Sequence, residues 1–104
     1  FIGCTNLKSM TLGNKVWIID ELAFFRCSEL SYVIIPENVT TIGNGAFSKC
    51  NKLKRVVFLG NPPKMASGVF GNKTQIYYRA GTSGWTSPEW NGYKTKAIVF
   101  YRRG

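Results

Sequence analysis

The sequence predicts a repeat solenoid, a mainly β fold in which short coils of chain stack on one another in register. The first observation behind this prediction is a spacing of 23 residues shared by three residue types: Cys4, Cys27 and Cys50; Phe1, Phe24 and Phe47; Leu7, Leu30 and Leu53. The second is a strand-like alternation of apolar residues within each copy. A fixed period of this length indicates a repeat array, because a single copy cannot bury its apolar face without neighbours.

The first half of each copy follows the frame F-x-x-C-x-x-L-x-x-Φ-x-Φ, where Φ is an apolar residue. In the second copy the last three apolar positions are Leu30, Val33 and Ile35. The alternation at the end of this run predicts a strand with one buried face. Copies two and three are rich in β-branched and aromatic residues here, as strands prefer. Stacked copies would therefore build a sheet.

The second half of each copy contains a further apolar pair, Val39 and Ile42 in copy two, which predicts a short extended segment on the opposite side of the coil. Gly43 and Gly45 then predict a turn. The remaining segment, 46–50, is too short to be a stable helix alone. We expect it to form one helical or 3-10 turn that closes the coil.

We expect the cysteines to be free thiols in the core, although three cysteines could also supply one disulfide and one free thiol. Equivalent residues of neighbouring coils stack about 4.8 Å apart with parallel side chains, whereas a disulfide needs Cβ atoms that converge to about 3.8 Å. The chain has no histidine and no C-x-x-C pair, so we predict no metal site and no cofactor. The predicted structural ladder comprises Cys4, Cys27, Cys50, Leu7, Leu30, Leu53, Phe24 and Phe47.

The repeat frame weakens toward the C-terminus. A degenerate fourth copy places Phe70 in register, with Lys73 at the cysteine position and Ile76 at the leucine position. We therefore assign 1–80 to the array, about three and a half copies, and 81–104 to an aromatic capping segment. Within that segment, 97–101 predicts a final strand.

Trp85, Trp90 and Tyr93 stand out within the capping segment. The terminal unit of a solenoid is atypical because it must seal the core, so we expect these rings to cover the last coil. The alternative is an exposed platform for glycans, since aromatic faces stack on the apolar faces of sugars. The sequence leaves both interpretations open.

Residues 27–47 follow the pattern C-x-x-L-x-x-V-x-I-P-x-x-V-x-x-I-G-x-x-A-F. This pattern resembles the BspA-like leucine-rich repeats, a cysteine-containing class found on bacterial surface proteins and in some protists. The resemblance covers residues 1 to about 80. It implies a right-handed array with a parallel sheet on one face. It also implies the C-terminal fragment of a longer secreted protein, located extracellularly or at the cell surface and used in adhesion. Copies one and three depart from the pattern, with Gly13 and Leu59 in place of the proline.

The net charge of +9 favours acidic partners. An acidic glycan is one such partner, whereas we do not expect nucleic acid; the plainer interpretation is that the charge only confers solubility. The basic residues concentrate in the third copy and near the C-terminus: Lys49, Lys52, Lys54, Arg55 and Lys64; Lys94, Lys96, Arg102 and Arg103.

Catalysis is not expected. The absence of histidine removes the commonest general base and the usual partner of a nucleophilic serine or cysteine. Asp20 and Glu21 are adjacent in the sequence, so their side chains diverge and do not form the carboxylate pair of a glycosidase. No stretch approaches the ~18 apolar residues of a membrane-spanning helix.

We expect a partner to bind the outward-pointing side chains of the sheet, with Tyr78 extending one of their columns. Tyrosine and arginine are enriched in interface hot spots, but pairing across strands could also select such residues. We therefore predict a monomeric, non-catalytic module that binds a protein, or a cell-surface or matrix glycoprotein. The alternatives are a structural spacer or terminal cap, and a basic-patch binder of acidic glycans. The predicted partner-binding residues are Ser9, Thr11, Tyr32, Ile34, Arg55, Val57 and Lys54.

Overall fold

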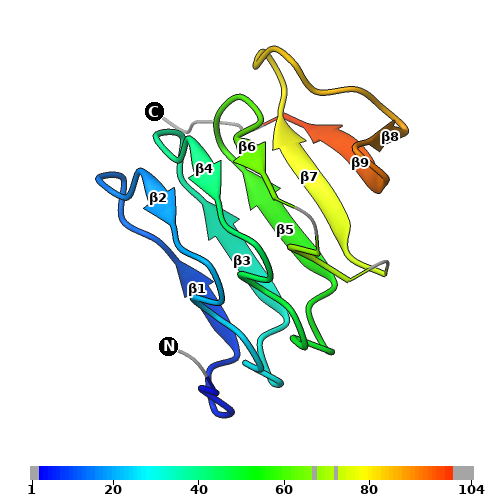
Figure 1. Cartoon of the computed structure of the whole chain (residues 1–104). Coiled ribbons are helices and arrows are strands. Elements are labelled where there is room, and N and C mark those ends of the chain that lie inside the picture. The colour runs from blue at the N-terminus through cyan, green and yellow to red at the C-terminus, as the bar shows by residue number, and fades with distance from the viewer. Residues whose placement is uncertain (1–2, 67, 72, 100–104) are drawn as a thin grey trace, which may run out of the picture.

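The computed structural model describes residues 3–66, 68–71 and 73–99. These residues wind into coils that lie side by side from the N-terminal to the C-terminal end (Figure 1). The large sheet has the spatial order β1 (Ser9–Thr11), β3 (Tyr32–Ile35), β5 (Arg55–Phe58), β7 (Gln75–Arg79), β9 (Tyr93–Ile98) and β8 (Glu89–Trp90). The small sheet contains β2 (Ile18–Ile19), β4 (Thr41–Ile42) and β6 (Lys64–Met65). The predicted mainly β solenoid is therefore confirmed.

The pairing register of the large sheet reproduces the 23-residue spacing in the first three coils. Ser9 pairs with Tyr32, and Tyr32 pairs with Arg55, in parallel ladders. The strands of the small sheet, β2, β4 and β6, are also parallel and follow the same spacing. Each coil therefore contributes equivalent residues to equivalent positions along the solenoid.

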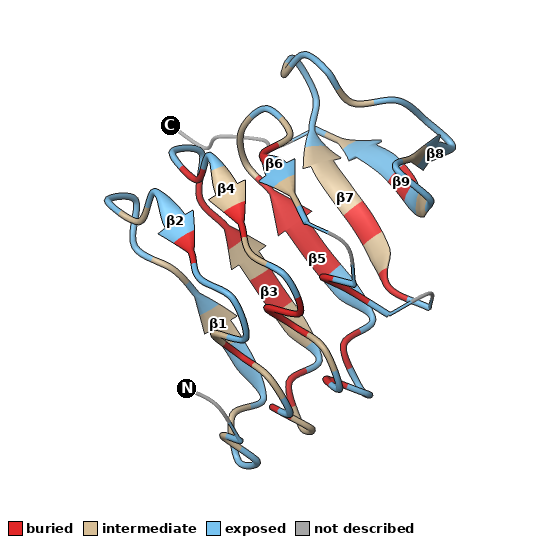
Figure 2. Ribbon diagram, viewed as in Figure 1, coloured by how far each residue is buried: buried red, intermediate tan, exposed pale blue. Residues whose placement is uncertain are grey.

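The core lies inside the coils, and Figure 2 shows buried segments at matching places in successive coils. Cys27 and Leu30 are 0% exposed. The rings of Phe24, Phe47 and Phe70 stack along the solenoid, with centroid separations of 5.1 and 5.3 Å. Burying one aliphatic or aromatic side chain of this size contributes about 1.5–3 kcal/mol. The stability of each coil therefore depends on the coils beside it.

The segment that closes each coil is a series of turns, which corrects the expected helical or 3-10 turn for the described residues. The Ala46 N–H donates to the Gly43 carbonyl at 3.2 Å, and the Ser48 N–H donates to the Gly45 carbonyl at 3.0 Å. Gly45 and Lys49 have φ values of 66° and 63°. Residues in this left-handed region interrupt the right-handed backbone that consecutive 3-10 bonds require.

The fourth coil is three residues shorter than predicted. Arg55 pairs with Gln75, and Phe58 pairs with Tyr78, so the spacing falls from 23 to 20 residues. Ile76 consequently lies opposite Val56 rather than at the leucine position. The predicted place of Tyr78 in the outward column is therefore wrong, because its pairing partner, Phe58, points into the core and is 1% exposed.

The last strand of the large sheet also begins earlier than predicted. β9 starts at Tyr93 and runs parallel to β7, while the short strand β8 pairs with it in the antiparallel direction. Of the predicted strand 97–101, Ala97 and Ile98 belong to β9, and residues 100 and 101 lie outside the described residues. The alternation that builds β9 places Thr95 in the core, where it is 6% exposed.

Candidate interaction surface

The outward-pointing side chains of the large sheet form a surface that we call the outer face. In β3, Val33 and Ile35 are buried, whereas Tyr32 and Ile34 are partly exposed, so the alternation of the strand decides which side chains point outward. The pairing register arranges the outer face in two rows: Ser9, Tyr32, Arg55, Gln75 and Lys94; and Thr11, Ile34, Val57, Tyr77 and Lys96.

The centre of the outer face contains a contact between an arginine and an aromatic ring. The guanidinium carbon of Arg55 lies 5.2 Å from the centroid of the Tyr32 ring, which is within the range of a cation–π interaction. Arg55 therefore lies over its neighbour in the row. Ile34 is partly exposed in the adjacent row. Together these three residues present a cation, an aromatic ring and an aliphatic side chain at one place.

Val57 was predicted among the outward-pointing, partner-binding residues, but its side chain is only 6% exposed. Its neighbours in the row are Ile34 on one side and Tyr77 on the other. These larger side chains flank Val57 on the two adjoining strands and limit the access of solvent to it. The aliphatic part of the outer face is therefore centred on Ile34.

The remaining predicted residues lie at the margins of the outer face. Ser9 and Thr11 are exposed on the first strand. Lys54 is exposed immediately before β5, and its backbone N–H donates to the Ser31 carbonyl at 3.3 Å. Ser31 in turn donates its N–H to the Lys8 carbonyl at 2.9 Å. The structure thus brings Lys54 to the edge of the surface, at the end of a short column of coil-to-coil bonds.

The basic residues of the third copy do not form a single patch. Lys49 lies in the closing turn, Lys52 lies in the turn that follows it, and Lys64 lies on the small sheet, away from the outer face. The Lys52 Nζ lies 2.5 Å from a carboxylate oxygen of Glu29. The hydrogen bond from Lys52 lowers the pKa of Glu29. Of this cluster only Lys54 and Arg55 can contribute charge to the outer face.

The three cysteines form no disulfide with one another, and Cys27 and Cys50 lie in the core. Burial raises the pKa of Cys50 to about 11 and also raises the pKa of Cys27. Both thiols are therefore protonated at neutral pH, whereas nucleophilic or metal-binding cysteine acts as the thiolate. The Cys50 Sγ donates to the Phe24 carbonyl at 3.1 Å and so links two coils. In 3–66, 68–71 and 73–99, no three metal-ligating acidic, cysteine or histidine side chains converge.

Trp85 packs into the C-terminal end of the core. Its ring contacts Phe58 and Trp90 at centroid separations of 4.9 and 4.7 Å, and it stacks on Tyr78 at 5.5 Å. Its indole N–H donates to the Gly60 carbonyl at 3.0 Å. This ring is therefore engaged on several sides by the protein itself.

Tyr93 is similarly engaged at the end of the core. Its ring meets Phe70 edge-on at 5.6 Å. Its hydroxyl accepts the Phe70 N–H at 3.2 Å and lies 3.3 Å from the Phe70 carbonyl, to which it donates. These contacts support a sealing role for the aromatic segment more directly than a glycan platform.

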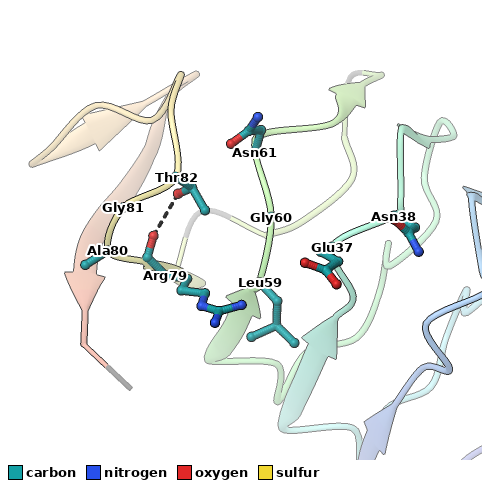
Figure 3. A pocket seen from close by; sticks show the side chains of 9 residues that line it. All are labelled: Glu37, Asn38, Leu59, Gly60, Asn61, Arg79, Ala80, Gly81 and Thr82. Atoms are coloured by element: carbon teal, nitrogen blue, oxygen red, sulfur yellow. Dashed lines mark hydrogen bonds between the residues drawn. The ribbon is translucent and has the colours of Figure 1, made fainter. Parts of the chain in front are cut away.

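A separate groove of about 490 Å³ lies at the turns that follow β3, β5 and β7 (Figure 3). The groove offers charged and amide groups, but it contains no thiol, no histidine and no pair of carboxylates. It can therefore form hydrogen bonds, and Glu37 is the one carboxylate among its lining residues. Its lining residues are Glu37, Asn38, Leu59, Gly60, Asn61, Arg79, Ala80, Gly81 and Thr82.

Sequence reasoning did not assign four residues to the two rows of the outer face: Gln75, Tyr77, Lys94 and Lys96. The first two were misplaced because the fourth coil is shorter than the others. The last two alternate with Tyr93 and Thr95, and this period of two could have predicted a strand. No helix formed by the described residues is long and apolar enough to cross a membrane.

Comparison with known proteins gives one match. A family model described as the BspA type leucine rich repeat region matches residues 1–86, in six copies. Searches of curated proteins and of solved structures returned no match. The matched region contains the outer face from β1 to β7 and ends before β8.

Proposed function

Because this chain belongs to the BspA-type leucine-rich repeat family, we propose that it is a non-catalytic module that binds a protein or glycan partner through the outer face. Repeats of this kind are interaction modules whose stacked units present one extended surface. The observation that carries the proposal is the cluster of Tyr32, Ile34 and Arg55 at the centre of that surface. Tyrosine and arginine are the residue types that dominate interface hot spots.

The setting that we propose is the outside of a cell. The chain would be part of a longer secreted surface protein, and its partner would be a protein, a cell-surface glycoprotein or a matrix glycoprotein. This proposal is supported by the family to which the chain belongs. In the same proposal, residues 1–80 form the array and 81–104 form the segment that caps it, a role supported by the packing of Trp85 and Tyr93.

A second candidate function is a structural spacer or terminal cap that binds no partner. The contacts of Trp85 with Phe58 and of Tyr93 with Phe70 favour it, because a sealed end is what a terminal unit needs. The two functions differ in one respect that can be measured. A spacer tolerates changes on the outer face, whereas a binding module does not.

The test is the triple substitution Tyr32→Ala, Ile34→Ala and Arg55→Ala, measured as adhesion to immobilised matrix glycoproteins. We expect the affinity to fall by at least about tenfold, because hot-spot residues each contribute more than about 1 kcal/mol. The matched control changes exposed residues elsewhere: Asp20→Ala, Lys49→Ala and Lys64→Ala. Circular dichroism would show whether both variants remain folded. Adhesion that is unchanged in the folded triple variant would favour the spacer.

A further inference from the structure

We propose that the ligand of the outer face is an acidic polysaccharide, which runs across the strands over β5, β7 and β9. This inference rests on the proposed function, because it names the class of partner for the same surface. It depends on Lys94 and Lys96, which reach the outer face only because β9 continues the parallel sheet beyond β7.

The first argument is charge. Arg55, Lys94 and Lys96 are exposed on the C-terminal half of the outer face, with Lys54 at its edge. Among the described residues of the third coil and of 73–99, the only carboxylate is that of Glu89. Glu89 pairs in register with Lys94. An excess of cations on an open surface attracts a polyanion and raises its rate of association. Because these cations lie on one side of the molecule, they would attract a polyanion to the outer face.

The second argument is the repeat of groups along each row. Adjacent strands of a sheet are about 4.8 Å apart, so side chains in a row recur at that interval. One row reads Arg55, Gln75 and Lys94, and thus places one cation on each side of an amide. The other places the partly exposed ring of Tyr77 beside Lys96. Alternating cations, hydrogen-bonding groups and aromatic rings suit a chain of sugars that carry acidic groups at regular intervals.

The third argument is the shape of this half of the outer face. A shallow hollow of about 270 Å³ lies there, lined by Gln75, Pro88, Glu89, Lys94, Thr95 and Lys96. All of its lining residues except Pro88 carry a polar or charged group, although carbon atoms make up most of the surface that they expose to the hollow. Val57, the apolar residue nearest to the hollow in the row, is 6% exposed. A protein partner normally seats an apolar or aromatic anchor in a pocket at the centre of the interface. This hollow instead offers an acidic ligand the ammonium groups of Lys94 and Lys96 and the amide of Gln75, against the single carboxylate of Glu89.

The experiment measures binding of the full chain to heparin and to chondroitin sulfate by isothermal titration calorimetry. The test variant carries Lys94→Glu and Lys96→Glu, which reverse two exposed charges of the outer face. The matched control carries Lys15→Glu and Lys64→Glu, which make the same change in net charge at exposed positions on the other side of the coils. Desulfated heparin and polyglutamate serve as ligand controls. Circular dichroism checks that each variant is folded.

We expect the test variant to lose at least about tenfold in affinity for the sulfated glycans, and the control variant to lose less than about threefold. We also expect binding to weaken as salt rises, because these charges are exposed to screening. Equal losses in both variants would overturn the inference, since net charge alone would then explain binding. Binding of polyglutamate as tight as that of heparin, with the same sensitivity to the test variant, would also overturn it and point to an acidic protein.

The result separates this inference from the proposed function. If neither glycan binds, but the substitutions at Tyr32, Ile34 and Arg55 still abolish adhesion to matrix glycoproteins, the polysaccharide inference fails and the proposed function stands. If the glycans bind, the test variant releases them, and the substitutions at Tyr32, Ile34 and Arg55 abolish adhesion, both stand.

Discussion

The first and the last described coils differ in how their apolar side chains are covered. In the first coil Cys4, Leu7 and Met10 are only partly buried. Their counterparts in the next coil include Cys27 and Leu30, which are 0% exposed. The two coils share the same frame, so the difference does not come from their own residues. It teaches that burial in this fold is conferred by the neighbouring coil.

At the C-terminal end the core is covered without a further regular coil. There the stack of phenylalanine rings ends at Phe70, which is 6% exposed although no further phenylalanine of the period follows it within 73–99. Tyr93 packs edge-on against it, and Trp85 covers Phe58. Irregular aromatic residues thus do at this end what a further coil would do elsewhere.

The largest expected effect is a contrast between two leucines at equivalent positions. Leu30→Ala removes a 0% exposed side chain and should destabilise the protein by about 2–5 kcal/mol, because it leaves a cavity in the core. Leu7→Ala should cost less than half as much, since that side chain is already partly exposed. Urea unfolding would measure both. Equal losses would contradict the view that neighbouring coils set the burial.

A smaller effect is expected from alkaline pH. Burial raises the pKa of Cys50 from 9.0 to about 11, so the folded protein holds this proton more tightly than the unfolded chain does. The associated stability is complete below about pH 9 and is lost as pH rises to about 11, by about 2 kcal/mol. Unfolding in urea across this range would measure the loss. Cys50→Ala should lack this component, whereas Cys4→Ala, which changes an only partly buried thiol, should retain it.

The smallest effect tests the seal at the C-terminal end. Tyr93→Phe keeps the ring and removes the hydroxyl that bonds to the Phe70 backbone, so it should destabilise the protein by about 1 kcal/mol. Tyr32→Phe makes the same chemical change on the outer face and should change stability by less than about 0.5 kcal/mol. Thermal unfolding of the two variants would compare them. A neutral Tyr93→Phe would show that the hydroxyl does not hold the seal.

The sequence was sufficient to predict the regular part of the fold. The spacing of 23 residues gave the correct pairing of Ser9 with Tyr32 and of Tyr32 with Arg55, because every position in those coils has a counterpart. It failed where the chain leaves the period. Between Phe70 and Ile76 there are three residues fewer than between the equivalent positions of the third coil, and nothing in a single sequence shows where they are missing.

The candidate surface was predicted only in part for the same reason. Tyr32, Ile34 and Arg55 lie where the frame placed them. The burial of Val57 could not be foreseen, because it depends on the size of Tyr77, whose register had shifted. Lys94 belongs to a strand that follows no repeat frame and is positioned by its pairing with Gln75. Residues outside a repeat are placed by three-dimensional packing, which the period does not encode.

The backbone bonds that join one coil to the next, such as those from Gly43 to Ile19 and from Ser31 to Lys8, have a mechanical consequence. A pulling force applied to the two ends acts on the coils in series, so the outermost coil detaches before the next one is disturbed. Each detached coil of 23 residues would release roughly 75–80 Å of extended chain. We therefore expect a tether built from such coils to lengthen in steps under tension, and to keep the surface of its remaining coils intact as it does so.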